Sequence, residues 1–258
     1  MDLGISGKKA IICASSRGLG KGCAVALANA GVELTINGRN ADTTNATADE
    51  LMGLGAKVNI VLGDVSDPAT QAELLDACPN PDILINNNGG PPLKDFRELD
   101  RDAILAGVTQ NMVTPIELIK SVIDGMAERK FGRIVNITSL SVYAPIMGLD
   151  LSSGARAGLT AFLAGIAPSV AAQNVTINNI LPGKFDTDRI RNTVAFAAKK
   201  KGVDLESETK NAQNLIPAKR FGTTEEFGST AAFLCSVHAG YMTGQNIILD
   251  GGSYSSAF

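Results

Sequence analysis

Short apolar runs alternate along the chain with longer segments of helical periodicity, and this alternation limits the possible folds more than any other feature. Short runs of β-branched and aliphatic residues are typical of strands that are buried on both faces of a parallel sheet. The predicted strands are residues 9–13, 33–36, 58–62, 83–85, 133–137, 175–181 and 246–249. No repeat, linker or change of composition interrupts the alternation. We therefore predict one α/β domain over residues 1–258, a doubly wound parallel sheet with helices on both faces.

Two segments between the predicted strands have features of their own. A continuous apolar stripe at helical spacing runs from Ile104 to Met126. Residues 183–222, in contrast, are polar and rich in Lys and Glu, and they are too long for a simple connection. We predict a partly helical lid there, and we assign the basic run at residues 199–201 to a solvated helix end.

Composition and charge exclude several kinds of partner. The formal net charge is −3 and the pI is about 5.3, which argues against binding to nucleic acid or to an anionic membrane. No apolar run approaches the roughly 20 residues that span a bilayer, and the N-terminus has no signal-peptide pattern. The four cysteines lack metal-ligand spacing and His238 is the single histidine, so we predict no metal site. A cytoplasmic location follows as an expectation.

A glycine-rich segment stands immediately after the first predicted strand. Residues 12–22 read ICASSRGLGKG and open the first predicted helix. A strand-to-helix turn of this kind brings backbone close to a pyrophosphate and directs the helix N-terminus at it. Glycines alone are a weak signal, because any turn between a strand and a helix favours them. Their position after the first strand makes this segment a candidate dinucleotide site.

Three further stretches lie where strands are predicted to end. They are GDVSD at 63–67, INNNGG at 85–90 and NNILPGKFDTD at 178–188. Open α/β sheets bind ligands at the carboxyl ends of their strands, so these stretches would meet at one site. With the glycine-rich turn and GQNIILDGG at 244–252, the chain resembles the short-chain dehydrogenase/reductase family over its whole length. The resemblance implies a Rossmann fold.

The resemblance also implies a set of cofactor-binding residues. The glycine-rich turn would wrap the pyrophosphate, the end of the third strand would contact the adenine, and the asparagine-rich stretch would contact the adenosine ribose and the sheet centre. The segment after the sixth strand would cover the nicotinamide. This set is Ser15, Ser16, Arg17, Gly18, Leu19, Gly20, Asp64, Val65, Asn87, Asn88, Gly89, Pro182, Gly183, Phe185 and Thr187.

Two positions in this set of motifs differ from the family pattern. Cys13 and Ala14 stand where the family has Thr-Gly. We expect Ala14 to avoid a positive φ, so that its Cβ has only a mild cost. Asn88 stands where the family has a small Ala, and this side chain is expected to narrow the cofactor cleft.

The residues after the second predicted strand favour NADP over NAD. An acidic residue there would hydrogen-bond the adenosine ribose and repel a 2′-phosphate. The sequence INGRN at 36–40 has no acid and places Arg39 at this point. Arg17 in the glycine-rich turn is a second cation, and guanidinium groups suit phosphate geometry.

The catalytic pattern of the family is only half present. In the family a Ser polarises the substrate carbonyl, a Tyr transfers the proton, a Lys lowers the Tyr pKa and an Asn carbonyl holds a relay water. Ser139 and Asn111 match the Ser and the Asn, and Pro115 would leave the carbonyl of residue 111 without its helical N–H partner. The Tyr and Lys positions hold Ser152 and Arg156.

Ser152 and Arg156 are not equivalent to Tyr and Lys. An aliphatic hydroxyl is a far weaker acid than a phenol, and Arg stays protonated and so cannot pass a proton on. Arg156 can still keep a positive charge near the nicotinamide and hydrogen-bond a ribose hydroxyl. Tyr143, four residues after Ser139, is the first alternative proton donor, and its other interpretation is a packing residue on the pocket rim. Asp150 is a weaker candidate, because an exposed carboxylate is already ionised at pH 7.

We therefore predict an NADP-dependent oxidoreductase that acts on a small carbonyl, alcohol or imine with a non-standard proton donor. Reduction of a protonated imine would need no Tyr. The alternative is a nucleotide-binding protein without turnover, a sensor or partner subunit. The altered pair resembles a divergent branch of the family, similar to 3-oxoacyl-[acyl-carrier-protein] reductases. The resemblance also implies a homo-oligomer, a dimer or tetramer, in which the helices over residues 104–126 and 155–172 pair with their symmetry mates.

Overall fold

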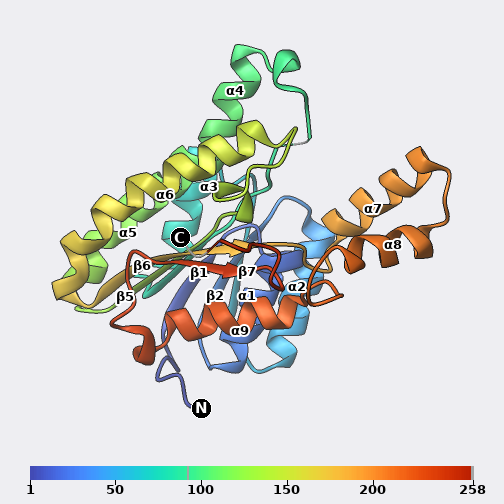
Figure 1. Cartoon of the computed structure of the whole chain (residues 1–258). Coiled ribbons are helices and arrows are strands. Elements are labelled where there is room, and N and C mark those ends of the chain that lie inside the picture. Colours follow the sequence, from blue (N-terminus) through green and yellow to red (C-terminus); the bar gives the residue numbers. More distant parts are fainter. Residues whose placement is uncertain (92, 257–258) are drawn as a thin grey trace.

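The computed structural model describes residues 1–91 and 93–256 and confirms the doubly wound α/β fold (Figure 1). In this part of the chain seven parallel strands form one sheet, in the order β3-β2-β1-β4-β5-β6-β7. Every predicted strand is present, and the ends differ by at most two residues. The strands are β1 (Lys9–Ile12), β2 (Glu33–Gly38), β3 (Val58–Leu62), β4 (Ile83–Asn86), β5 (Gly132–Ile137), β6 (Val175–Pro182) and β7 (Asn246–Leu249).

The strand order places the ligand crevice. The chain first runs outward from β1 to β3 and then crosses back, so that β4 pairs with the other side of β1. Between β1 and β4 the chain leaves in opposite directions, and a crevice opens at the carboxyl ends of these two strands. The glycine-rich turn follows β1 and the asparagine-rich stretch follows β4, so both predicted segments border this crevice.

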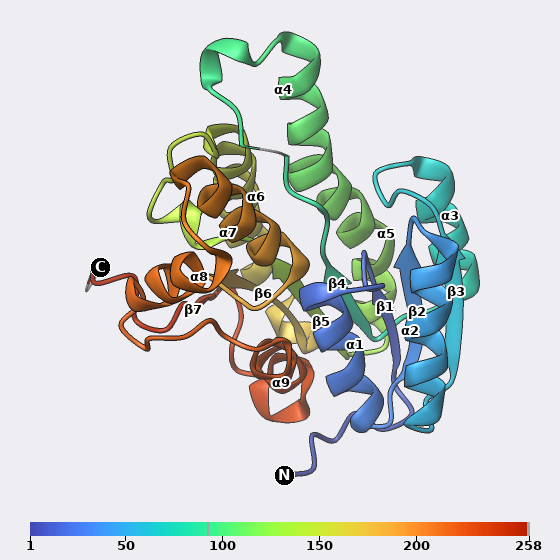
Figure 2. The same cartoon turned by 90° about the vertical axis from the view of Figure 1, so that its right-hand side faces the viewer.

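Helices cover both faces of the sheet (Figures 1 and 2). Alternate strand residues supply the two cores: Ile12, Ile36 and Ile85 point to one face, and Ile11 and Leu84 point to the other. The first core packs against α1 (Gly18–Asn29), α2 (Ala41–Gly53) and α9 (Thr224–Cys235). The second packs against α3 (Pro68–Ala77), α5 (Thr114–Glu128) and α6 (Asp150–Val170). This two-sided burial explains the continuous apolar character of the strands.

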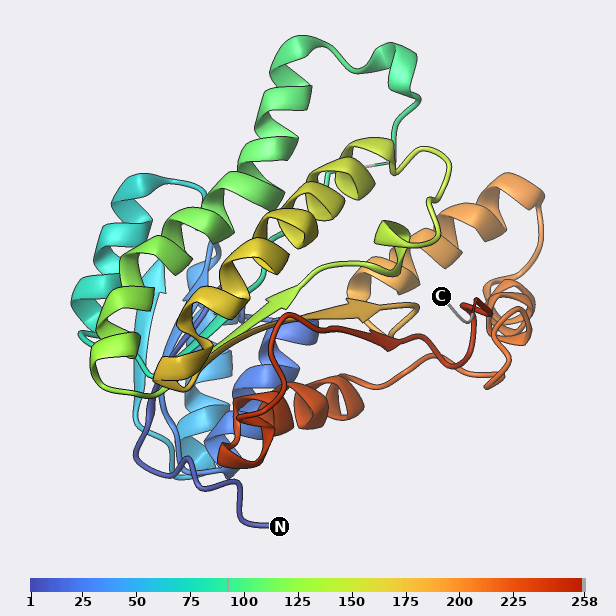
Figure 3. The ribbon, with the colours of Figure 1, turned by 60° about the vertical axis from the view of Figure 1, so that its left-hand side comes forward.

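The predicted stripe from Ile104 to Met126 forms a helical run with a break in the middle. It comprises α4 (Arg101–Val108), a π-helical turn η2 (Thr109–Val113) and α5, and α4 projects beyond the sheet (Figures 1 and 3). The break falls directly before Pro115, which cannot donate a main-chain hydrogen bond. Ile104 and Leu105 on α4 are exposed, so the stripe is buried only in its α5 half.

The helix α6 corrects one sequence-based prediction. Together with the short η4 (Ala171–Gln173) it spans Asp150–Gln173 and has a mean hydropathy of 1.3. By length and composition alone, this helix could cross a membrane. The prediction missed it because small Ala and Gly residues, rather than large aliphatic ones, supply its apolar character. In the structure its inner face packs on the sheet through Leu159, Leu163 and Ala167.

The segment predicted as a lid contains two helices. They are α7 (Asp188–Lys201) and α8 (Leu205–Asn214), which project from the sheet as a pair (Figure 1). Val194, Ile216 and Phe221 form a small core of their own beneath them. Lys199, Lys200 and Lys201 occupy the last turn of α7, as predicted for a solvated helix end. Three short 3₁₀ turns complete the described elements: η1 (Phe96–Glu98), η3 (Leu140–Val142) and η5 (Val237–Ala239).

Candidate active site

The glycine-rich turn presents an open helix N-terminus at the crevice. Arg17 is the N-cap of α1 and makes no side-chain capping bond. The first-turn amides of a helix have no partner inside the helix, and here none is capped by a side chain. Gly18 has a φ of +59°, which a side chain would disfavour. The arrangement suits an anion at the N-terminus of α1.

Ala14 contradicts the expectation of an ordinary backbone conformation. Its φ is +44°, in the left-handed region that favours glycine. Its neighbours impose this conformation: the Ala14 N–H donates to Asn37 Oδ1 at 3.1 Å, and Asn87 Nδ2 donates to the Ala14 carbonyl at 3.0 Å. The expected mild cost of Ala at this position is therefore wrong, and the turn is strained.

Ala14→Gly is expected to raise the free energy of unfolding by about 0.5–1 kcal/mol. Relief of a left-handed Ala returns about 1–2 kcal/mol, and the greater freedom of Gly in the unfolded chain removes part of that gain. Urea unfolding of both proteins measures the difference. Ala46→Gly, in the exposed middle of α2, is the matched control and should instead destabilise by about 1 kcal/mol. A loss of stability in Ala14→Gly would contradict the strain.

Buried polar side chains hold the turn in place. Ser15 is fully buried, and its hydroxyl donates to the Ile12 carbonyl at 2.8 Å and accepts from the Asn37 N–H at 3.1 Å. Its main-chain N–H donates to the Asn37 carbonyl at 2.8 Å, so neither donor of Ser15 is free for a pyrophosphate, contrary to its predicted role. A Cβ on Gly20 would lie 2.5 Å from the Ala14 carbonyl oxygen, so this position admits only glycine. Sequence reasoning missed Asn37, whose one signal is a polar residue in an apolar strand.

The segment after β6 meets the turn. A Cβ on Gly18 would lie 3.7 Å from Thr187 Cγ2, and both residues line a groove between the start of α1 and the start of α7. Pro182 ends β6 and Gly183 follows it, and a Cβ on Gly183 would lie 2.7 Å from Asp250 Cβ. Phe185 differs from its predicted role, because its ring is buried edge-on against Phe227, with centroids 5.3 Å apart. Only the main chain of Phe185 is free to contact a cofactor.

The two predicted phosphate-binding arginines are exposed and only loosely paired. Arg39 Nη1 lies 3.8 Å from Asp64 Oδ2, and Arg17 Nη1 lies 3.9 Å from Asp188 Oδ2. Exposed ion pairs of this kind contribute about 0–1 kcal/mol, so both guanidinium groups can turn to a stronger anion. Arg39 follows β2 and Asp64 follows β3, neighbouring strands whose carboxyl ends share one edge of the sheet.

The remaining predicted cofactor residues follow β1, β3 and β4, at the carboxyl edge of the sheet. Val65 is buried in the core, Leu19 packs against the other core, and Ser16 and Arg17 line the groove at α1. Asn88 Nδ2 donates to Ser66 Oγ at 2.8 Å and to the Gln110 carbonyl at 3.2 Å, and Asn88 Oδ1 accepts from the Gly89 N–H. These bonds fix the Asn88 side chain between β4 and η2.

Ser139 and Tyr143 flank the turn η3 that follows β5. Ser139 is its N-cap and accepts from the Ser141 N–H at 3.1 Å, so its own hydroxyl proton stays available. The Tyr143 side chain is 43% exposed, accepts from Asn246 Nδ2 at 2.7 Å and stacks on Tyr254, with centroids 5.7 Å apart. The phenol oxygen thus has a fixed N–H beside it, and its proton is free to be donated.

Ser152 and Arg156 form a buried pair at the start of α6. Arg156 Nε donates to Ser152 Oγ at 3.3 Å, and Arg156 Nη1 donates to the carbonyls of Ile137 at 2.6 Å and Thr138 at 3.2 Å. Burial and the nearby charge of Arg189 lower the pKa of Arg156 to about 10, so it stays protonated at neutral pH. Asp150 is exposed in the first turn of α6.

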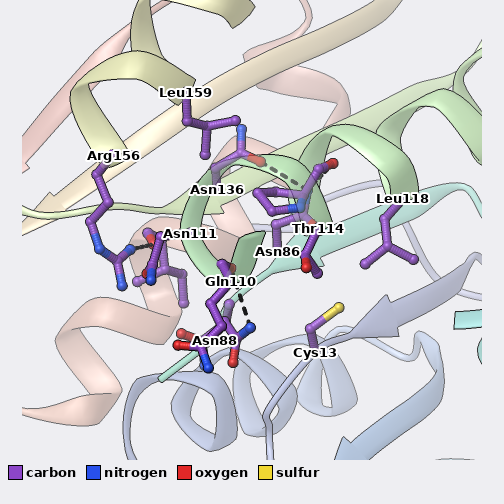
Figure 4. A pocket seen from close by; sticks show the side chains of 13 residues that line it. Cys13, Asn86, Asn88, Gln110, Asn111, Thr114, Leu118, Asn136, Arg156 and Leu159 are labelled. Atoms are coloured by element: carbon purple, nitrogen blue, oxygen red, sulfur yellow. Dashed lines mark hydrogen bonds between the residues drawn. The ribbon is translucent and has the colours of Figure 1, made fainter. Parts of the chain in front are cut away.

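A small polar recess lies under the π-turn (Figure 4). It holds about 20 Å³ of free space, enough for one water molecule, and Asn111 and Arg156 both line it. Three oxygen atoms on its walls are buried and have no hydrogen-bond partner among the described residues: Asn86 Oδ1, Asn111 Oδ1 and Thr114 Oγ1. Buried polar atoms of this kind are usually satisfied by water or a ligand. The helix break expected at Pro115 therefore lies beside a recess whose buried oxygen atoms could bind a water molecule or a ligand.

A row of asparagines crosses the sheet below this recess. Asn86 Nδ2 donates to Asn136 Oδ1 at 2.9 Å, Asn136 Nδ2 to Asn179 Oδ1 at 3.0 Å, and Asn179 Nδ2 to Asn246 Oδ1 at 2.8 Å. Asn246 then donates to Tyr143, so one hydrogen-bonded chain joins the recess to the phenol. Sequence reasoning missed the row, since it depends on the register between four strands.

The chain is similar to known reductases over almost its full length. A family model described as enoyl-(acyl carrier protein) reductase matches residues 13–254. The NADPH-dependent reductase BacG of Bacillus subtilis is 32% identical, covering 98% of this chain and 100% of that protein. A 3-oxoacyl-[acyl-carrier-protein] reductase FabG of Chlamydia pneumoniae is 31% identical, covering 98% of this chain and 99% of that protein.

The solved structures agree with the sequence relatives. L-sorbose reductase from Gluconobacter frateurii, crystallised with NADPH and L-sorbose, has a TM-score of 0.94 and 27% identity, covering 99% of this chain and 100% of its own. The glycine-rich turn after β1, the asparagine-rich stretch after β4 and Ser139 after β5 all lie at the carboxyl edge of the sheet. The chain therefore belongs to the short-chain dehydrogenase/reductase family.

Proposed function

We propose that this protein is an NADPH-dependent reductase of a small carbonyl or imine compound whose proton donor is not the residue at position 152. The observation that carries the proposal is the buried Ser152–Arg156 pair at the start of α6. The uncapped N-terminus of α1 suits a dinucleotide phosphate, whereas Ser152 is buried and accepts a hydrogen bond from Arg156. Hydride transfer depends mainly on the positioning of cofactor and substrate, which the retained parts of the site supply.

The residues at the crevice fit NADPH, and the cofactor is NADP. The uncapped N-terminus of α1 and the close approach at Gly20 suit a pyrophosphate, and Arg39 and Arg17 suit a 2′-phosphate. A relative named for its use of NADPH and a related structure solved with NADPH support the same choice. When bound, NADPH supplies the hydride.

The chain's own residues divide the remaining work. Ser139 donates its free hydroxyl proton as a hydrogen bond to the substrate oxygen, which stabilises charge that develops there. Arg156 would keep its positive charge near the nicotinamide ribose of bound NADPH. Asn111 and the recess under the π-turn hold a water molecule. Ser152 positions Arg156 by accepting its Nε–H.

Tyr143 is the group we assign to proton transfer. Its exposure leaves the phenol accessible to a substrate, and Asn246 donates to its oxygen, which stabilises the charge that remains after the proton leaves. Its place on the same short turn as Ser139 supports this assignment. A substrate that arrives as a protonated imine would need no donor.

The experiment that tests the function combines binding with turnover. Titration should give tight NADPH binding, and NADPH absorbance should fall when a panel of small aldehydes, ketones and cyclic imines is added. The double variant Ser152→Tyr with Arg156→Lys separates the two hypotheses. Loss of existing activity supports a pocket rebuilt around another donor, and appearance of activity from zero supports a silent nucleotide-binding scaffold.

The pair α7–α8 acts as a lid over the nicotinamide site in this proposal. It packs on a core of its own and projects from the sheet (Figure 1). Hydrogen exchange over residues 183–222 is expected to be fast in the free protein and slower with NADPH and a substrate analogue, because closure would protect these amides. Uniformly slow exchange in the free protein would contradict a lid.

We also propose a homo-oligomer, a dimer or tetramer, in the cytoplasm. The outer face of α6 is largely uncovered, since only 33% of its apolar span is buried, and Phe162 on it is 46% exposed. A two-fold interface between copies of this helix would cover that surface. Light scattering at micromolar concentration should give a multiple of the chain mass, and Phe162→Glu should shift it toward a monomer. A monomeric mass for the unchanged protein would rule this out.

A further inference from the structure

The hydrogen bonds of the asparagine row all run in one direction. The row consists of Asn86, Asn136, Asn179 and Asn246, and each side-chain N–H donates to the side-chain oxygen of the next residue. The last N–H donates to the Tyr143 oxygen at 2.7 Å. At the other end, in the recess (Figure 4), the Asn86 oxygen is buried without a partner among the described residues. The row therefore has a free acceptor at the recess and its last donor at the phenol.

Two main-chain carbonyls fix this direction. The oxygen and nitrogen of a side-chain amide have similar shapes, so the orientation of the amide follows from its hydrogen-bond partners. Asn86 Nδ2 also donates to the Pro115 carbonyl at 3.4 Å, and Asn136 Nδ2 also donates to the Asn178 carbonyl at 3.3 Å. If either amide turned over, its oxygen would face a carbonyl oxygen at a buried position, where such a contact is costly. The carbonyls therefore hold both N–H groups in the direction of Asn179.

The orientation of these two amides determines that of the last one. Asn179 must present its oxygen to the Asn136 N–H, so its own N–H faces Asn246. Asn246 must then accept with its oxygen, which leaves its N–H for Tyr143. A phenol oxygen that accepts this bond keeps its own proton for another partner, whereas a reversed Asn246 would present an oxygen and take that proton.

We propose that the asparagine row directs the proton of Tyr143 toward the substrate, an inference that rests on the proposed role of this phenol in the reductase. Asn136 and Asn179 are buried, so they are positioning residues that act on the phenol through Asn246. Hydrogen bonds in a chain polarise one another, so the aligned amides strengthen the bond that Asn246 donates. Stacking on Tyr254 fixes the ring plane, and the row fixes the direction of the O–H bond.

Raman spectroscopy tests this direction in the free protein, without turnover. The intensity ratio of the tyrosine Fermi doublet is high when the phenol oxygen accepts a hydrogen bond and low when the O–H donates to a strong acceptor. The chain has three tyrosines, so Tyr241→Phe with Tyr254→Phe leaves Tyr143 alone and keeps an aromatic ring against it. In this background Asn246→Asp, on the edge strand β7, puts an oxygen in place of the N–H beside Tyr143. The phenol must then donate, and the ratio should fall.

Asn179→Leu tests whether the row, and not Asn246 alone, sets the direction. Leu has nearly the shape of Asn but no polar atom, so it removes two links of the row without adding a buried charge. The Asn246 amide is then free to turn over, and the ratio should fall part of the way. Asn59→Leu is the matched control, the same change on an exposed residue of β3 at the opposite edge of the sheet. It should leave the ratio unchanged.

Both row variants should also lower the turnover number about tenfold, the usual contribution of one hydrogen bond, with NADPH affinity unchanged. An unchanged ratio in Asn246→Asp, or in a folded Asn179→Leu, would overturn the proposal. Failure of the proposed function looks different. A lower ratio with full turnover would establish the orientation of the phenol and contradict Tyr143 as the proton donor, whereas lost turnover with an unchanged ratio would contradict the row and leave that assignment intact.

Discussion

Tyr143→Phe is expected to lower the turnover number about 10²–10⁴-fold, the usual contribution of a general acid, and to leave NADPH affinity nearly unchanged. The substitution removes only the phenol oxygen, so the stacking on Tyr254 is kept and Asn246 loses one acceptor. Steady-state rates at saturating NADPH, with a separate binding titration, measure the two quantities.

Two controls isolate the role of the phenol proton. Ser152→Ala should lower turnover far less, because that hydroxyl is a poor acid and serves to position Arg156. Tyr241→Phe removes a phenol oxygen from a fully exposed ring before β7 and should change nothing. An active enzyme whose turnover survives Tyr143→Phe would show that the proton comes from another group, or that the substrate arrives already protonated.

Arg39→Asp is expected to change the ratio of NADPH to NADH affinity by about 10²–10³. Loss of a charge-assisted bond to the 2′-phosphate accounts for about 10–100-fold, and the new carboxylate repels the phosphate and accepts from a ribose hydroxyl. In the protein Arg39 contacts only Asp64, in an exposed ion pair at 3.8 Å, so its replacement should change the stability of the fold little. Fluorescence titration with both cofactors gives the ratio.

Lys57→Asp is the matched control for the charge. It makes the same reversal on an exposed side chain that precedes β3, at the opposite end of the strand from Asp64, and should leave the ratio unchanged. Equal affinity of the unchanged protein for NADPH and NADH would contradict the role of Arg39 and Arg17.

The strands could be predicted because burial on both faces makes each one a continuous apolar run. The small errors have local causes. The apolar run ends before the polar Asn37, but β2 continues to Gly38 because the Asn37 side chain donates to the carbonyls of Val61 and Gly63. The break before α5 was also predictable, since Pro115 lacks an N–H whatever its surroundings.

The features that sequence reasoning missed depend on contacts between distant segments. The conformation of Ala14 is set by Asn37 and Asn87, which are 23 and 73 residues away. The asparagine row joins residues separated by 50, 43 and 67 positions, and no single strand reveals which of its residues lie side by side. Arg189 is an ordinary charge in a polar segment until the fold brings it to Gly90.

Transfer of deuterium from NADPH labelled at the nicotinamide C4 tests the central claim most directly. Each C4 epimer is mixed with the protein and the carbonyl and imine panel, and the products are read by mass spectrometry after one turnover. The account predicts deuterium in at least one product, from one epimer only, and the same label with Ser152→Ala. Stoichiometric binding of NADPH with no deuterium in any product would contradict it and identify a nucleotide-binding protein without turnover.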